Sequence, residues 1–309
     1  RTSGFIKGII MRKVITASAF FLFIVIPQVS LAQQIDVGTL LEEMVDRSKI
    51  AEFPEPAFQC KQFSSYNRET VAVGEEGWFA NADSSFFEGY EDIDGRREWI
   101  MMDVEGPGSV VRWWLTQQTF DGTVRIYLDG SDEPIFAATS DKIVGGSAIT
   151  GRPLSNVVGW NGRNLYMPIP FKKHCKITYD GPNANVTGKF PDCHYYNINY
   201  IKYSAETDVK MLTKDDITKY SALIDQVQEK LLKPEENKLA VSRKADGGKK
   251  TLKSGQSLAK KIKGVGAISS LELKIDSDDI ATAMRTTVIS ISFDDKKHAL
   301  STVGEFFGC

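Results

Sequence analysis

Carboxylates, aromatic rings and side-chain amides are the groups in this sequence that could do chemistry. The sequence contains no nucleophilic triad motif, phosphate-binding loop, dinucleotide fingerprint or zinc signature. Hydrolysis of a glycosidic bond needs two carboxyl groups, about 5 Å apart in enzymes that retain the anomeric configuration and further apart in those that invert it. Flat rings stack on sugar faces, and amides bind hydroxyl groups. These residue types point to sugar handling, although many exported β-sandwich proteins carry them too.

Two carboxylates stand at equivalent places in two similar stretches of the chain. Residues 106–130 and 264–295 each hold a Gly-rich turn followed by an alternating strand, and Asp141 or Glu305 comes soon after that strand. A repeat period of roughly 160 residues indicates a duplicated domain rather than a solenoid. The sequence stops soon after the second strand. We therefore expect a truncated second domain without most of its closing strands, in which a site built from both copies is incomplete.

The cysteines and histidines lack the spacing of metal ligands. His174-Cys175 and Cys193-His194 suggest a zinc set, but neighbouring residues on a strand face opposite sides, so a structural role is favoured. In an oxidising compartment Cys175 and Cys193 could form a disulfide, and the alternative is two buried thiols. The sequence implies no metal and no organic cofactor.

The N-terminus has the pattern of a signal peptide. Met11-Arg12-Lys13 supplies positive charge, residues 14–27 are mostly apolar, and Ser30-Leu31-Ala32 offers a cleavage site before Gln33. The rival interpretation is a membrane anchor, for which the apolar run is short. We expect an exported protein, periplasmic or extracellular, with no stable membrane anchor after cleavage.

Hydrophobic periodicity predicts short strands with few helices. The segments with period-two alternation are residues 99–104, 109–116, 123–128, 175–179 and 195–203. Regularly spaced strands favour an antiparallel sandwich or jelly roll over an α/β sheet. A short amphipathic helix is expected over residues 37–48. A longer one is expected over residues 215–232, with Thr213 as its cap and Pro234 as its stop.

The chain is long enough for two domains and divides into five parts. They are a signal peptide with upstream residues (1–32), an N-terminal helix and lead-in (33–58), a first β domain (59–212), a helix with a Lys-rich linker (213–263) and the start of a second β domain (264–309). The Lys-rich run is a solvated linker or hairpin rather than a polyanion contact. A net charge of -2 and a pI near 6.0 give no reason to expect a nucleic-acid partner.

Several longer strings occur in a recognisable order. They are 62–68 (QFSSYNR), 103–108 (DVEGPG), 111–114 (VRWW), 125–130 (RIYLDG), 166–171 (YMPIPF) and 195–200 (YYNINY). The series resembles glycoside hydrolase family 172, first catalogued as domain of unknown function 2961. The resemblance covers about residues 60–210, and a shorter match covers 264–309.

This resemblance implies an all-β fold of two tandem jelly rolls, each a β-sandwich, with a linking α-helix and with the second jelly roll incomplete here. It implies assembly into trimers or larger homo-oligomers. The implied activity is hydrolysis of α-linked furanosides, fructofuranosyl or D-arabinofuranosyl, in an oligo- or polysaccharide substrate. The implied mechanism retains configuration and uses two glutamates near a subunit boundary, without a cofactor. The competing hypothesis is a noncatalytic carbohydrate-binding or scaffold protein of a glycan-utilisation system.

The resemblance assigns Glu305 as a catalytic carboxylate, expected to be the nucleophile. Residues 303–308 (VGEFFG) match the family's G-[DE]-F-F-G string. The alternative is that Glu305 caps the turn after a strand. The second glutamate of the family is expected beyond Cys309, so no residue of this sequence is assigned to it.

The other carried-over residues are expected to bind the sugar. Ser65, Tyr66 and Arg68 match an S-Y-D-R string, with Arg68 as a hydroxyl donor and Tyr66 as a wall. This sequence has Asn67 where the family usually has Asp, which removes a charge beside Arg68. The alternative is that the string braces the end of a strand.

Three tryptophans and one amide complete the predicted binding residues. They are Trp113, Trp114, Trp160 and Asn164. Trp113 and Trp114 are neighbours on a predicted strand, so one is expected to face the core and the other the outside. An exposed tryptophan serves as a stacking platform or an oligomer contact. Trp160 and Asn164 lie in or next to a Gly-rich loop.

Overall fold

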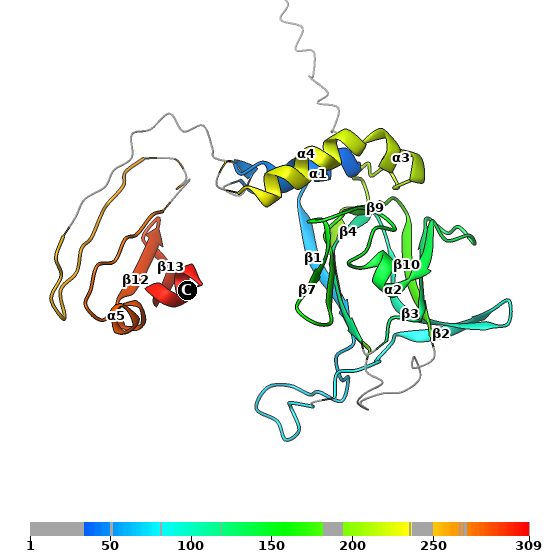
Figure 1. The fold of residues 1–309 in the computed structure, drawn as a ribbon, viewed down its shortest axis with the longest axis horizontal. Coiled ribbons are helices and arrows are strands. Elements are labelled where there is room, and N and C mark those ends of the chain that lie inside the picture. Colours follow the sequence, from blue (N-terminus) through cyan, green and yellow to red (C-terminus); the bar gives the residue numbers. More distant parts are fainter. Residues whose placement is uncertain are drawn as a thin grey trace, which may run out of the picture. The chain divides into compact units, whose positions relative to one another are not determined.

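The computed structural model (Figure 1) describes residues 34–49, 52–80, 82–117, 119–181, 194–234, 236, 250–264, 266, 268 and 271–308. The predicted signal peptide at 1–32 lies outside these residues, as do Cys193 and Cys309. No helix within the described ranges is long and apolar enough to cross a membrane.

Two antiparallel sheets form a sandwich, with β1, β4 and β7 in one and β2, β3 and β10 in the other (Figure 1). The six-stranded sheet has the order β1 (Phe58–Ser64), β11 (His194–Tyr203), β4 (Gly108–Gln117), β8 (Gly162–Leu165) and β7 (Ser155–Val158), with β9 (Ile169–Phe171) paired to β4. The five-stranded sheet has the order β2 (Gly89–Ile93), β3 (Arg96–Glu105), β10 (His174–Asp180), β5 (Thr123–Leu128) and β6 (Phe136–Thr139). The predicted all-β sandwich is confirmed, and each predicted strand lies within β3, β4, β5, β10 or β11.

The core lies between the two sheets and follows the period-two alternation of the strands. On β11, Tyr196, Ile198 and Tyr200 are buried, whereas the intervening Asn197 and Asn199 are partly exposed. Because successive side chains of a strand face opposite sides, the apolar set fills the core and the amides lie on the outer face of the sheet.

One helix precedes the strands of the sandwich in the chain, and two helices come directly after them. They are α1 (Val37–Val45), α3 (Lys214–Lys219) and α4 (Ser221–Leu232). Thr213 caps α3 as predicted, through a hydrogen bond from the Asp216 backbone N–H to its hydroxyl. The single helix predicted over residues 215–232 is wrong, because Tyr220 interrupts it. The Tyr220 hydroxyl donates to Asp36 Oδ2 at 2.6 Å, and this bond to the start of α1 holds the residue outside helical geometry.

A carboxylate at the end of β5 accounts for one of the recognised strings. Asp129 has a left-handed backbone, with φ of 56°. Its Oδ1 accepts backbone N–H bonds from Lys172, Lys173 and His174 at 2.9, 2.6 and 3.2 Å. A carboxylate satisfies three donors at once, so Asp129 ties the turn after β5 to the start of β10.

The two similar stretches of sequence share an order of elements. The first contains β5, β6 and α2 (Ser140–Ile143); the second contains β12 (Val288–Phe293), β13 (Lys296–Thr302) and α6 (Val303–Phe307), preceded by α5 (Ile280–Thr286). Asp129 and Asp294 both have positive φ after the first strand, and Asp141 and Glu305 both lie in the first turn of the short helix. This shared order supports the duplication.

The candidate disulfide between Cys175 and Cys193 stays a prediction, because Cys193 lies outside the described residues. Cys175 itself has none of its surface exposed. It lies on β10 between β3 and β5, with its side chain in the core. Burial there raises the pKa of the thiol well above its usual range. The burial of Cys175 agrees with either interpretation, since both a disulfide and a buried thiol place this side chain in the core.

Candidate functional site

Glu305 is an exposed carboxylate held in place by two hydroxyl groups. It is the third residue of α6, and its Oε2 accepts from Ser301 Oγ at 3.2 Å and from Thr302 Oγ1 at 3.1 Å. The Glu305 N–H donates in return to Thr302 Oγ1 at 3.4 Å. This reciprocal pair resembles a capping box, so the capping interpretation describes the local structure. The same contacts orient a solvent-accessible carboxylate, which a nucleophile also requires.

The Arg68 guanidinium makes its hydrogen bonds and its ion pair with groups of the protein itself. Its Nη1 donates to the carbonyl oxygens of Tyr66 at 2.9 Å and Phe86 at 3.2 Å. Its Nη2 donates to the Ser64 carbonyl oxygen at 3.2 Å and forms an ion pair with Glu88. These contacts join the end of β1 to the segment before β2. They favour the brace interpretation of the string over a free hydroxyl donor.

The neighbours of Arg68 divide into one exposed ring and two buried polar groups. Tyr66 is half exposed, with the Arg68 guanidinium carbon 4.6 Å from its ring centroid. Ser65 is buried, and its hydroxyl accepts from the Tyr196 N–H at 3.2 Å. Asn67 is buried as well, and its Oδ1 accepts from the Glu69 N–H at 3.0 Å. A carboxylate could accept the same bond, so Asn67 preserves the turn without the charge. Of the predicted binding residues Ser65, Tyr66 and Arg68, Tyr66 is the one whose side chain is available to a ligand.

The two adjacent tryptophans of β4 face opposite sides of the sheet. Trp113 is completely buried in the core, so its assignment as a sugar-binding residue is wrong. Trp114 is partly exposed on the outer face of the six-stranded sheet. The sequence predicted the division between the two but not which residue was outside.

Trp114 lies in the middle of a row of residues that crosses five strands. It is paired with Asn164 of β8 and with Asn197 of β11. Asn197 is paired with Ser64 of β1, and Asn164 with Asn156 of β7. Residues directly opposite each other on neighbouring strands project to the same face. We call Ser64, Asn197, Trp114, Asn164 and Asn156 the amide row.

A second set of polar residues lies beside the amide row. Gln62, Asn199 and Arg112 are paired across β1, β11 and β4. Arg112 Nη1 donates to Asn199 Oδ1 at 3.0 Å, and Asn199 Nδ2 donates to Gln62 Oε1 at 2.9 Å. Neither the amide row nor this set contains a carboxylate, so these eight residues supply no acid or base for glycosyl transfer. Its groups suit the binding of a neutral polar ligand.

Sequence reasoning missed most of this face. Only Trp114 and Asn164 were predicted as binding residues, whereas Asn197, Asn199 and Asn156 were not. A signal was present for two of them, because Asn197 and Asn199 alternate with apolar residues on a strand. Trp160, 85% exposed, lies in the turn between β7 and β8, the hairpin that carries Asn156 and Asn164.

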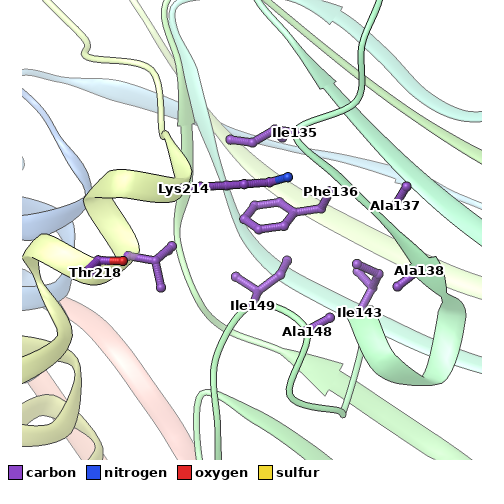
Figure 2. A pocket seen from close by; sticks show the side chains of 10 residues that line it. Ile135, Phe136, Ala137, Ala138, Ile143, Ala148, Ile149, Lys214 and Thr218 are labelled. Atoms are coloured by element: carbon purple, nitrogen blue, oxygen red, sulfur yellow. The ribbon is translucent and has the colours of Figure 1, made fainter.

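An apolar hollow of about 360 Å³ lies elsewhere, between β6, α2 and α3 (Figure 2). Figure 2 shows the Lys214 side chain beside the Phe136 ring, above Ile149 and Ile143. None of the predicted site residues lines it. With one lysine and no carboxylate in its lining, it lacks the groups that glycosyl transfer needs.

The two described histidines of the suggested zinc set face different surroundings. His174 lies on the outer face, with Nε2 2.6 Å from Asp103 Oδ1. His194 is buried, with its ring centroid 4.3 Å from that of Tyr179 and 5.6 Å from that of Phe87. Neither His194 ring nitrogen has a hydrogen-bond partner in the described part of the chain. Burial lowers the pKa of His194 to about 3, so the ring is neutral.

We expect acid to destabilise the protein through His194. A histidine in the unfolded chain has a pKa near 6.5, so the unfolded state binds a proton at this residue below that pH. The folded state does not bind this proton until the pH falls to about 3. The free energy of unfolding should fall by about 1.4 kcal/mol per pH unit in this window through this residue alone. Urea denaturation of the wild type and of His194→Phe, from about pH 7 to about pH 5, measures the effect. Equal slopes for the two proteins would contradict the assignment.

Comparison with known proteins agrees with the resemblance seen in the strings. The model of the GH172 first beta-sandwich domain matches residues 56–220, just over half of the chain. This segment begins just before β1, contains both sheets and ends with α3. The chain matches no curated protein.

Proposed function

Because the chain belongs to glycoside hydrolase family 172, we propose that the protein is an exported glycosidase acting on α-linked furanosides. The substrate groups are fructofuranosyl or D-arabinofuranosyl residues of an oligo- or polysaccharide. The observation that carries the proposal is the family match over residues 56–220, which coincides with the sandwich.

In the proposed mechanism Glu305 is the nucleophile and a second glutamate is the general acid. The acid protonates the leaving-group oxygen while a Glu305 carboxylate oxygen bonds to the anomeric carbon and the glycosidic bond breaks. Water, deprotonated by the second glutamate, then displaces Glu305, so that the product keeps the configuration of the substrate. The hydroxyls of Ser301 and Thr302 would orient Glu305 for attack.

We also propose assembly into a trimer or larger homo-oligomer. The segment between β1 and β2 exposes several large apolar side chains. They are Val73, Trp78 and Phe79, which are 84, 45 and 65% exposed. Apolar side chains gathered on one exposed segment are typical of a protein interface, which supports assembly.

A second candidate function is noncatalytic carbohydrate binding or scaffolding. It is favoured by the amide row and the set beside it, in which Trp114 and several amides occur and none of the eight residues is a carboxylate. The two functions differ in whether a glycosidic bond is broken, so one assay separates them.

The decisive assay follows the anomeric configuration of the first product. The protein expressed from its complete reading frame is incubated with fructofuranosyl and D-arabinofuranosyl oligosaccharides, and proton NMR spectra are recorded before the product mutarotates. We expect release of the α-anomer first, and an α-linked methyl furanoside when methanol is added. Release of the β-anomer first would refute the retaining mechanism. Binding without any hydrolysis would support the second candidate instead.

A further inference from the structure

We propose that the amide row on the first sandwich binds a neutral furanosyl oligosaccharide that lies across the strands, with one sugar ring on Trp114. This inference rests on the proposed function only in taking a carbohydrate as the ligand. It requires no catalysis, so it can fail or succeed independently of Glu305.

The geometry of the row supports an extended ligand. Its members come from β1, β11, β4, β8 and β7 and are paired residue to residue. Neighbouring strands are about 4.8 Å apart, so a row across five of them extends about 19 Å. Side chains at such regular intervals along one line match a chain of repeated units. A single compact ligand would contact only part of the row.

The chemistry of the row suits sugar hydroxyls. An amide offers both a donor and an acceptor, as a hydroxyl does, and an indole offers a flat apolar surface. Beside the row, the Arg112 guanidinium donates a hydrogen bond to the side-chain oxygen of Asn199. The side-chain nitrogen of Asn199 then donates to Gln62. These amide orientations are set before a ligand arrives, which reduces the entropy cost of binding.

Two carbonyl oxygens in the row lack a donor. Asn197 Oδ1 and Asn156 Oδ1 are shielded from solvent and have no hydrogen-bond partner within the described residues. They lie on opposite sides of Trp114 along the row. A buried oxygen without a donor is costly, and most such atoms in native proteins are satisfied. A ligand hydroxyl would supply the missing donor once neighbouring side chains shift to admit it.

The charges of this face exclude other classes of ligand. A cation would need carboxylates, and the eight residues described here contain none. A polyanion would need several cations, and the one cation among these eight residues is Arg112, which already donates to Asn199. A neutral polyol is the class that remains. A protein partner is an alternative occupant that the experiment distinguishes.

Binding can be tested by calorimetry on the complete chain carrying Glu305→Gln, so that no ligand is consumed. The probes are short oligosaccharides of fructofuranosyl units and of D-arabinofuranosyl units. Trp114→Ala should weaken binding of the preferred probe about tenfold, equivalent to about 1.4 kcal/mol. Tyr90→Ala, which removes an exposed ring from β2 of the five-stranded sheet, should leave the dissociation constant unchanged.

A second variant separates a binding role from a structural one. Because Asn156 Oδ1 accepts no hydrogen bond within the described residues, Asn156→Ala should not lower the melting temperature and should still weaken binding several-fold. Unchanged affinity in both Trp114→Ala and Asn156→Ala would overturn the proposal. So would a change from oligomer to monomer in Trp114→Ala without loss of affinity, because the face would then contact a second copy.

Discussion

Replacement of Glu305 by glutamine is expected to reduce the proposed furanosidase activity by about 10³-fold or more, the scale of loss seen when a nucleophile is removed. Glutamine keeps the shape of the side chain and can still accept from Ser301 and Thr302, so the cap on α6 should survive. The amide cannot form the covalent intermediate, so kcat should fall while the melting temperature stays constant. Steady-state kinetics and thermal denaturation of the same preparation measure the two quantities.

The duplication provides a matched control for this variant. Asp141 stands in the first turn of α2, where its Oδ1 accepts from Thr139 Oγ1 at 2.6 Å, as Glu305 accepts from Thr302. Asp141→Asn removes the same charge from the equivalent place and should retain activity. Azide should restore turnover to Glu305→Ala and yield a furanosyl azide, because a small anion can take the place of the missing nucleophile. Full activity in Glu305→Gln would contradict the prediction that Glu305 is the nucleophile, and would show that the residue only caps α6.

Replacement of Glu98 by glutamine should lower the free energy of unfolding by about 3 kcal/mol, because it breaks a buried charged network. Glu98 is completely buried on β3. Its carboxylate accepts from Arg96 Nε at 2.7 Å, Thr178 Oγ1 at 2.7 Å and the Tyr127 hydroxyl at 2.8 Å. Glutamine would leave Arg96 without its buried counter-charge and would turn a donor toward groups that themselves donate. Urea denaturation near neutral pH gives the difference.

A neighbouring surface pair serves as the control. Glu91 accepts from Lys176 Nζ at 2.7 Å but is 39% exposed, so Glu91→Gln should cost less than about 1 kcal/mol. Equal losses in Glu98→Gln and Glu91→Gln would contradict the role given to the buried network.

The effect of Glu98 should also depend on pH. Burial raises the pKa of Glu98, but hydrogen bonds from Thr178, Arg96 and Tyr127 outweigh it, so the pKa lies below its ordinary value. The stabilisation is therefore complete above the unfolded value of about 4.3 and is lost as pH falls through the lower folded value. The difference in the free energy of unfolding between the wild type and Glu98→Gln should therefore become smaller in acid.

Local patterns in the sequence determined the strands, the cap and the duplication. The alternation along residues 123–128 and 195–203 depends only on which side each residue faces, a property of the strand itself. The cap at Thr213 is a contact between residues three positions apart. The order Gly-rich turn, alternating strand and later carboxylate was readable twice in the chain. Each of these features is decided by neighbours in the sequence.

Contacts between distant residues decided the rest. Nothing local indicates that Tyr220 interrupts a helix, since its hydrogen-bond partner is Asp36. Alternation could say that Trp113 and Trp114 face opposite sides, but the core side depends on which sheet packs against β4. The amide row exists only because the register of five strands aligns residues from Ser64 to Asn197. Register is set by hydrogen bonds between strands that are far apart in the chain, so the tertiary structure alone reveals which side chains meet.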